Sequence, residues 1–376
     1  MAAPPQKLPL DKSSRILYTS GIVTDNDTGS SLTCSPMKNH SISVRIQDVA
    51  RAAGVSVSTV SRVLNGREDV AAETYERITQ IINELGYSSS LAAKSMRSQR
   101  TDVIGVVIFD LSNPFCMEVV RGIEQVVQAQ AYDLMIYTSN SANHRDDPAW
   151  ERKVVTQLSG SLVDGIIVVT PTTNNFPTNH PLVIIDPCDV GNFPAVIATN
   201  RTGACAATTY LISLGHRRIG LIGGTPSLLS ARQRQAGYEE ALEQAGLSML
   251  DELCVQGDYS RQTALIGARQ LLTMASPPTA ILAANDQSAF AVLEVAHTLG
   301  IRVPEALSVI GFDNTAESAY SDPPLTTVDQ SIVQMGSQAA KLLMQRIEGQ
   351  TVENRLYELP TQLVIRQSCQ PLTLHG

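Results

Sequence analysis

The chain has 376 residues, of which 43% are hydrophobic and 17% are charged, and its formal net charge is −8. This length allows two or three domains with substantial cores, and the composition is typical of a soluble globular protein. No apolar run approaches the roughly 18 residues of a membrane span, and the first residues form no apolar secretory segment, so we expect a cytoplasmic protein without a membrane partner. The six cysteines form no CxxC pair and the histidines do not cluster, which indicates reduced thiols and no metal site.

The negative charge is unevenly distributed. Residues 45–100 hold eight Lys and Arg against six Asp and Glu, whereas residues 101–376 hold 16 against 27. A mildly basic head on an acidic body is typical of a protein that contacts nucleic acid at one end. Because the positive surplus on the head is small, we expect two heads to act together in a homodimer.

Residues 1–44 are rich in Ser, Thr, Asn and Pro and show little periodicity, which predicts a disordered leader. Met37 lies shortly before the first periodic segment. Translation could therefore start at Met1 or at Met37.

Residues 45–87 predict a small helical domain. Apolar residues spaced i, i+3, i+4 and i+7 predict a first helix: Ile46, Val49, Ala50 and Ala53. Gly54 ends this helix, and Ser56 can cap a second one. A third helix is predicted over residues 72–85, ended by Gly86, with these residues on its inner face: Ile78, Ile81, Ile82 and Leu85.

The second helix carries Val57, Val60 and Leu64 on the side that we expect to face inward. Its other side is polar, and two short helices joined by a glycine turn with such a face are typical of a DNA-reading helix-turn-helix. A generic helical hairpin would more often carry Glu and Lys there. The candidate DNA contacts at the start and on the outer side of this helix are Ser56, Val57, Ser58, Thr59, Ser61, Arg62 and Asn65.

From Val103 onward, short apolar runs alternate with helical stretches, a doubly wound α/β pattern that occurs twice. Ligands of such folds bind beyond the carboxyl ends of the strands and between two lobes. Polar and aromatic residues follow the predicted strands or begin the helices after them: Asn113, Phe115, Asp186, Arg234, Tyr259, Asn285 and Asp313. Such groups suit a sugar, which needs paired donors and acceptors and an aromatic face.

The segment DVARAAGVSVSTVSRVLN, followed in order by LGHRRIGLI, ANDQSA, VIGFDN and PPLTTV, resembles the lactose/purine repressor (LacI/GalR) family from about Arg45 to Cys369. The resemblance implies an N-terminal all-α headpiece and an α/β, two-lobed, periplasmic-binding-protein-like core with two doubly wound parallel sheets, spanning residues 101–376. It also implies a dimer on a pseudo-palindromic DNA operator and lobe crossings near Thr199, Thr327 and Gln350.

Residues 88–100 are identified by the same resemblance as a hinge helix that orders on DNA. Met96 would enter the minor groove as a wedge, and Lys94 matches the family in this segment. A helix this short should not persist alone in water, so a flexible linker is the alternative.

Within the core, the resemblance assigns effector contact to Arg234, Tyr259, Asn285 and Asp313. We expect Arg234 and Asp313 to hold the effector from opposite sides. Helix capping is the alternative role for Asn285 and for its neighbour Asp286, where capping is favoured, and closure of a turn is the alternative role for Asp186.

Motifs of catalysis are missing from the sequence. It contains no GxxxxGK[ST], no GxGxxG spacing and no GxSxG, so we expect no cofactor and no enzyme. The predicted function is a DNA-binding transcriptional regulator controlled by a small-molecule effector that is a sugar or sugar derivative. Repression is the favoured mode of regulation, and activation is the alternative. The alternatives are a non-regulatory solute-binding protein and a sugar-acting enzyme with a DNA-binding anchor.

Overall fold

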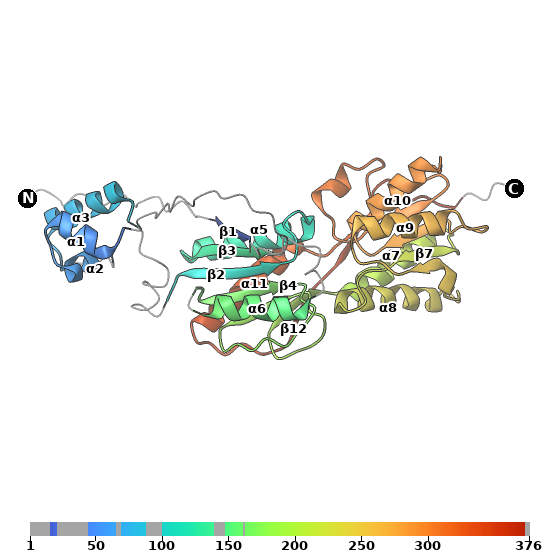
Figure 1. Ribbon diagram of the computed structural model, residues 1–376. Helices are drawn as coiled ribbons and strands as arrows, with labels where there is room; N and C mark the ends of the chain where they lie inside the picture. The colour runs from blue at the N-terminus through green and yellow to red at the C-terminus, as the bar shows by residue number, and fades with distance from the viewer. Residues whose placement is uncertain are drawn as a thin grey trace, which may run out of the picture. The chain divides into compact units, whose positions relative to one another are not determined.

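The computed structural model describes residues 16–20, 44–64, 69–87, 100–138, 147–160 and 162–372. The chain forms two compact units (Figure 1). One is the headpiece unit, Ile22–Thr101, and the other is the core unit, which comprises Asp102–Gly376 and Met1–Gly21.

Three short helices make up the headpiece: α1 (Ile46–Ala53), α2 (Val57–Leu64) and α3 (Ala72–Leu85). Gly54 and Gly86 end α1 and α3 in the left-handed conformation, with φ of 63° and 61°, where a side chain would be strained. The small core contains Val49, Ala50, Ala53, Val60, Val63 and Ile78. The predicted helices and their glycine stops are therefore confirmed.

Two predicted inner-face residues lie outside this core. Val57 is 39% exposed, whereas Val63 is 4% exposed and takes the inner position on α2. Val60, Val63 and Leu64 have the i, i+3, i+4 spacing of one stripe on this two-turn helix, and Val57 lies a turn before it. Leu85, in the last turn of α3, is also 39% exposed.

The N-terminal lobe of the core unit is a parallel sheet with the strand order β1-β3-β2-β4-β5-β6-β12. Its strands are β1 (Ile16–Ser20), β2 (Val103–Ile108), β3 (Asp133–Thr138), β4 (Gly165–Val169), β5 (Leu182–Ile185), β6 (Ala195–Ala198) and β12 (Leu356–Leu359). Helices α5 (Pro114–Ala129), α6 (Pro148–Ser159) and α11 (Ile332–Ile347) pack on it (Figure 1). β2, β4, β5 and β6 are buried along their whole length, as expected of a parallel sheet covered on both faces.

Helices α5 and α11 approach each other through two glycines. A Cβ on Gly122 would lie 2.0 Å from the carbonyl oxygen of Val333, and one on Gly336 would lie 2.1 Å from that of Val119. The hydroxyl of Ser337 donates to the carbonyl oxygen of Gly122 at 3.0 Å. The two helix backbones are thus in direct contact, which only glycine allows.

Part of the leader is a strand. Residues Ile16–Ser20 form β1, which pairs parallel with β3 from Ile16 opposite Leu134 to Ser20 opposite Thr138. The prediction of disorder for residues 1–44 is wrong for these five residues, and residues 1–15 and 21–43 lie outside the described part of the chain. An edge strand offers unpaired backbone donors and acceptors, and the sequence ILYTS has the branched and aromatic residues that strands favour.

The C-terminal lobe is a second parallel sheet with the strand order β10-β9-β7-β8. Its strands are β7 (Ile219–Ile222), β8 (Cys254–Val255), β9 (Ala280–Ala283) and β10 (Ser308–Ile310). Around it lie α7 (Asn200–Ser213), α8 (Leu229–Gln244), α9 (Arg261–Leu272) and α10 (Asp286–Thr298), with the short 3-10 turns η2 (Asp251–Leu253) and η3 (Ala316–Ala319) (Figure 1). The two-lobed α/β fold with two parallel sheets is confirmed.

The chain crosses between the lobes three times. The first crossing follows β6 at Thr199, and the second follows β11 (Thr327–Asp329), as predicted. The third lies between β12 and β13 (Gln362–Val364), not near Gln350, because β12 still pairs with β6 in the first sheet whereas β13 pairs with β11. Hydroxyl groups of Thr199 and Thr361 lie 3.0 Å apart and join the first and third crossings.

Several further features of the described residues bear on function. His216 is buried, and its ring nitrogens contact Thr279 and Ser308 at 3.0 Å, so its role in the fold is structural. The cysteines in the described segments are free thiols, and these segments contain no group of three potential metal ligands. No helix in the same segments is long and apolar enough to cross a membrane.

Candidate functional site

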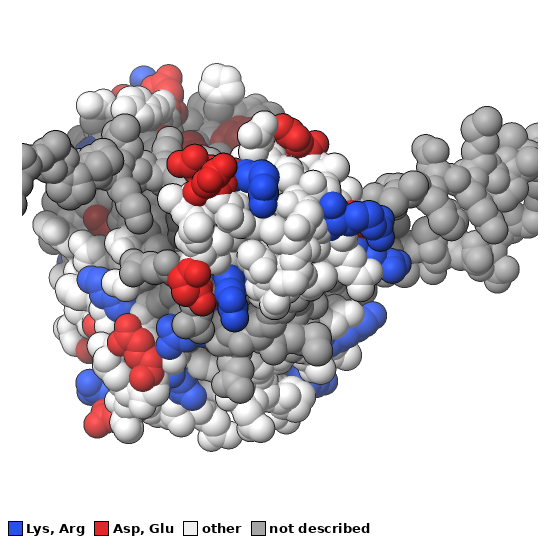
Figure 2. All heavy atoms as spheres, turned by 90° about the vertical axis from the view of Figure 1, so that its left-hand side faces the viewer, with Lys and Arg blue, Asp and Glu red and all other residues white. Residues whose placement is uncertain are grey.

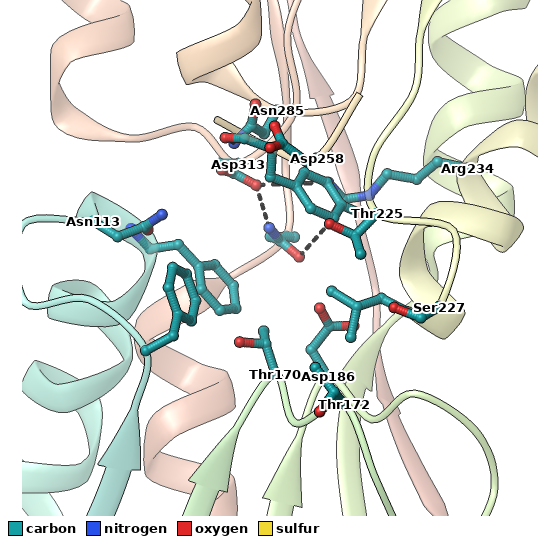
Figure 3. Close-up of a pocket in the computed structure, with 15 residues that line it drawn as sticks. Asn113, Thr170, Thr172, Asp186, Thr225, Ser227, Arg234, Asp258, Asn285 and Asp313 are labelled. Atoms are coloured by element: carbon teal, nitrogen blue, oxygen red, sulfur yellow. Dashed lines mark hydrogen bonds and ion pairs between the residues drawn. The ribbon is translucent and has the colours of Figure 1, made fainter. Parts of the chain in front are cut away.

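A cavity with an empty volume of about 720 Å³, part of it open to solvent, lies between the two lobes of the core unit. The residues that line it come from both lobes (Figure 3): Phe109, Asn113, Phe115, Thr170, Thr172, Asp186, Thr225, Ser227, Leu228, Arg234, Asp258, Tyr259, Asn285, Asp313 and Gln330. All seven predicted effector residues are among them.

The N-terminal lobe contributes residues from the carboxyl ends of β2, β4 and β5. Asn113 caps α5 by accepting from the backbone N–H of Phe115 at 2.9 Å, so its amide nitrogen is the group left to offer a ligand. Phe115 lies in the first turn of α5 and adds an aromatic residue to the cavity lining. Thr170 and Thr172 follow β4 and add hydroxyl groups.

Asp186 follows β5 and is 7% exposed. Its Oδ2 accepts from the hydroxyl of Ser230 at 3.0 Å, whereas its Oδ1 is buried and has no hydrogen-bond partner. Burial raises the pKa of Asp186 to about 6, although Arg234 and the hydrogen bond from Ser230 lower it. The alternative role of closing a turn with Pro187 does not account for a buried carboxylate that bonds across to the other lobe.

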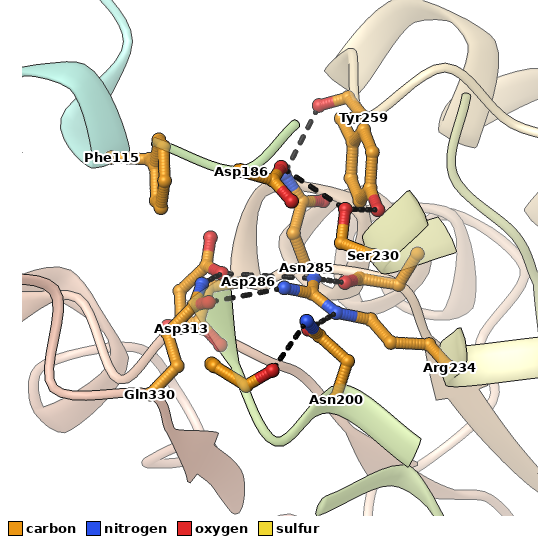
Figure 4. A network of polar contacts seen from close by, with 12 residues as sticks. Phe115, Asp186, Asn200, Ser230, Arg234, Tyr259, Asn285, Asp286, Asp313 and Gln330 are labelled. Atoms are coloured by element: carbon orange, nitrogen blue, oxygen red, sulfur yellow. Dashed lines mark hydrogen bonds and ion pairs between the residues drawn. The ribbon is translucent and has the colours of Figure 1, made fainter. Parts of the chain in front are cut away.

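Arg234 lies in α8 and is the centre of a polar network (Figure 4). Its Nε donates to Asn200 at 2.8 Å, and its two terminal nitrogens donate to the carbonyl oxygen of Ala284 and, at 3.2 Å, to the side chain of Gln330. The guanidinium carbon lies 3.7 Å from the ring centroid of Phe312. The side chain is thereby fixed in one orientation at the cavity.

Asp313 lies beside Arg234, not opposite to it. The nearest nitrogen and carboxylate oxygen are 3.9 Å apart, and Gln330 donates to Asp313 while accepting from Arg234 (Figure 4). The expectation that these two residues hold an effector from opposite sides is therefore wrong, because both belong to the C-terminal lobe. Asp313 and Asn314 have φ of 132° and 57°, a strained backbone typical of functional sites. Burial raises the pKa of Asp313 well above its ordinary value.

Tyr259 and Asn285 also line the cavity. The hydroxyl of Tyr259 lies 3.1 Å from that of Ser230, and its ring lies so close to Gly224 that a Cβ there would be 2.2 Å from the ring. Asn285 accepts from the backbone N–H of Ser288 at 2.9 Å and donates to the carbonyl oxygen of Tyr259 at 3.1 Å. Asn285 therefore both caps α10 and shapes the cavity.

Asp286 does not cap α10, contrary to the expectation from the sequence. Its carboxylate accepts from the backbone N–H of Thr315 at 2.8 Å and from the hydroxyl groups of Thr315 and Thr327, the latter at 2.5 Å. It is fully buried, and burial raises its pKa to about 6. Asp286 thus ties the turn after Asp313 to the second crossing.

Sequence reasoning missed part of the cavity lining. Four of the missed residues follow strands β4 and β7: Thr170, Thr172, Thr225 and Ser227. Ligands of this fold bind beyond the carboxyl ends of the strands, so a search of the residues after every strand would have found them. Gln330 follows a short strand in a crossing segment, and no local signal marks it.

On the headpiece, the start of α2 is polar and accessible. The hydroxyl of Ser56 accepts from the backbone N–H of Thr59 at 3.1 Å, which confirms the predicted cap, and lies 2.7 Å from the hydroxyl of Ser58. Ser56, Val57, Ser58 and Arg62 are exposed, and Thr59 and Ser61 are half-buried. Asn65, Lys94 and Met96 lie outside the described residues.

Arg62 is held only loosely in this conformation. Its Nε lies 3.7 Å from a carboxylate oxygen of Asp69, and both side chains are more than half exposed. On the face of the chain drawn in Figure 2, Lys and Arg side chains are interspersed with Asp and Glu among the coloured residues.

The helix-turn-helix unit and the two-lobed core match two family models. Residues 45–90 match bacterial regulatory proteins of the lacI family, and residues 208–369 match a periplasmic binding protein-like domain. The chain belongs to the lacI family of bacterial regulatory proteins. Its relatives are transcriptional regulators, several of them repressors, and not enzymes.

Three relatives illustrate the match. The HTH-type transcriptional repressor PurR of Photobacterium profundum is 32% identical over 335 residues, which cover 87% of this chain and 99% of the relative. The lac repressor dimer bound to operator and the anti-inducer ONPF has a TM-score of 0.73 at 28% identity, covering 87% of this chain and 99% of that one. The transcriptional regulator CelR in complex with cellobiose has a TM-score of 0.65 at 30% identity, covering 86% and 99%. The chain is a DNA-binding transcriptional repressor of this family.

Proposed function

We propose that a sugar or sugar derivative, bound in the cavity between the lobes, controls the affinity of this repressor for its operator. The observation that carries the proposal is the convergence of seven predicted residues, from strand ends and from the helices that follow, on one cavity between the lobes. Carboxylates, amides and hydroxyl groups there can pair with adjacent sugar hydroxyls, and Phe115 and Tyr259 can cover a C–H face. The related CelR structure contains cellobiose.

The cavity gives a physical route for control. Asn113, Phe115 and Asp186 belong to one lobe, and Arg234 and Asp313 to the other. A ligand that contacts both lobes favours the arrangement in which its contacts are complete, and it shifts the equilibrium only by its difference in affinity between arrangements. Coupling between two such sites is typically ~1–3 kcal/mol.

A homodimer on a pseudo-palindromic operator is the second part of the proposal. α2 of each subunit would enter the major groove of one half-site, with Arg62 donating to a guanine edge. The hinge function of residues 88–100, with Met96 as the wedge and Lys94 beside it, remains a prediction from the sequence. The protein would act in the cytoplasm, where the operator is.

A thermal-shift screen of the full chain against sugars, nucleosides and sugar phosphates tests the effector. A bound ligand raises the apparent stability by mass action, so a sugar that binds should raise the Tm and then change operator affinity. Arg234→Lys should abolish the shift, because lysine lacks the planar fork that holds this geometry. Arg201→Lys, an exposed arginine of α7, is the matched control. If nucleosides alone shift the Tm, the effector is not a sugar.

Arg62→Ala tests base reading. It should weaken binding to the specific operator by about 1–3 kcal/mol and relax the base preference at one position in each half-site. Arg51→Ala removes the same charge from the exposed surface of α1 and is the control, because it should leave base preference intact. If Arg62→Ala retains the full base preference, Arg62 does not read a base. The dimer has a separate test: a footprint of the wild-type protein that covers a single half-site would contradict it.

A further inference from the structure

The described residues that line the cavity carry an excess of negative charge. Asp186, Asp258 and Asp313 are acidic, and Arg234 is the single cation among these residues. Each of the three guanidinium nitrogens of Arg234 already donates to a protein acceptor. Three of its five N–H donors are therefore taken by the protein, and its charge is opposed by the three carboxylates of the lining.

Asp186, one of the residues that line the cavity, also has a carboxylate oxygen that lacks a donor. Oδ1 of Asp186 is buried and has no hydrogen-bond partner, although the neighbouring Oδ2 is satisfied by Ser230 (Figure 4). A buried polar atom left unpaired is unfavourable, and a donor from a ligand relieves that penalty. A hydroxyl or ammonium group supplies such a donor, whereas a phosphate or carboxylate does not.

We infer that this cavity selects effectors that offer hydroxyl or ammonium donors and carry no negative charge, so that a neutral or amino sugar binds and its phosphate ester or uronate does not. The inference rests on the proposed function in one respect, that the effector occupies this cavity. The reason is electrostatic. An anion placed beside two buried carboxylates is repelled in a medium that screens charge poorly.

Matched sets of ligands test the inference on the full chain. Each set holds a neutral hexose, its 2-amino form, its 6-phosphate and its uronate, and a parallel set pairs a nucleoside with its monophosphate. In the set that binds, calorimetry should give at least about tenfold weaker affinity for the anionic members, one factor of ten being 1.4 kcal/mol. An anionic member that binds as tightly as its neutral parent overturns the inference. Absence of binding by every member at millimolar concentration also overturns it.

The two proposals fail in different ways. If the nucleosides bind and no sugar does, the proposal of a sugar effector is wrong. The comparison of the nucleoside with its monophosphate then still tests the charge rule, which is that the cavity excludes negatively charged ligands. If sugars bind but their phosphates bind equally well, the charge rule is wrong and the sugar effector stands.

Asp186→Asn tests whether the charge of Asp186 excludes anionic ligands. It should narrow the ratio of neutral to uronate affinity, whereas Asp189→Asn, the same charge change at an exposed site three residues on, should leave the ratio unchanged. Equal ratios in both variants would show that anions are excluded by shape and would overturn the assignment to Asp186.

A measurement on the wild-type chain does not depend on the folding of a variant. Burial raises the pKa of Asp186 to about 6, and the charged or titratable groups that face it are Arg234, Tyr259 and Asp313. A uronate stays ionised from pH 8 to about pH 5, whereas Asp186 takes up a proton. The penalty against the uronate should therefore fall as the pH is lowered, and a constant ratio over this range would contradict the inference.

Discussion

Replacement of Arg234 by lysine should destabilise the protein as well as disable the cavity. Arg234 is 6% exposed and donates to acceptors from three segments: Asn200 in α7, Ala284 after β9 and Gln330 after β11. A lysine ammonium at this position can reach one of these acceptors and leaves the other two unpaired. It also loses the planar contact with the ring of Phe312.

The magnitude follows from these contacts. Each lost hydrogen bond to a charged group contributes about 1.5 kcal/mol at the low end of the usual range, and two are lost. Loss of the stacked guanidinium adds up to about 1 kcal/mol. We expect Arg234→Lys to lower the free energy of unfolding by about 3–4 kcal/mol, with effector affinity reduced at least about tenfold because the same side chain is displaced from the cavity.

Urea unfolding followed by two signals measures the loss. Trp150, the single tryptophan of the chain, lies in α6 of the N-terminal lobe, so its fluorescence reports that lobe, whereas far-UV circular dichroism reports both. The dichroism transition should move to lower urea in Arg234→Lys and not in Arg201→Lys, and the fluorescence transition should move less if the lobes unfold separately. A free energy of unfolding within about 0.5 kcal/mol of wild type, the range of surface substitutions, would refute the reasoning.

Three further predictions concern single sites. Gly122→Ala should destabilise the N-terminal lobe by about 1–3 kcal/mol, as measured by urea unfolding. The new Cβ would overlap the carbonyl oxygen of Val333, and the energetic cost of this overlap exceeds the gain in helix propensity of about 1 kcal/mol. Asp286→Ala should lower stability by about 2–4 kcal/mol, since three buried donors of Thr315 and Thr327 lose their acceptor; an unchanged Tm would count against this. Burial raises the pKa of Glu151, which accepts from the backbone N–H of Thr172, from 4.5 to about 7, so the native state binds more protons and stability falls as pH rises from about 4.5 to 7. Glu151→Gln should flatten this dependence by up to about 3 kcal/mol between pH 5 and pH 8, and an equally steep profile would contradict it.

The helix ends, the fold class and several cavity residues of this protein could be predicted from its sequence, because they depend on local chemistry. Helix ends depend on one residue's conformational freedom, so Gly54 and Gly86 located the ends of α1 and α3. The alternation of apolar runs with helical stretches defined a parallel α/β fold, and parallel strands place their carboxyl ends on one edge. That rule, together with the family resemblance for Arg234 and Asp313, predicted that these two residues and Asp186 contact the effector, and all three line the same cavity.

Tertiary structure decided how those residues are used. The sequence shows that Asn285 and Asp286 begin a helix, but the distant Thr315 and Thr327 determine that Asp286 bonds across the lobe while Asn285 makes the cap. In the same way, Gln330, 96 residues from Arg234, places Arg234 and Asp313 side by side. Hydrophobic periodicity depends on neighbours within a turn or two, whereas a buried hydrogen bond depends on which segments the fold brings together, and only the folded chain holds that information.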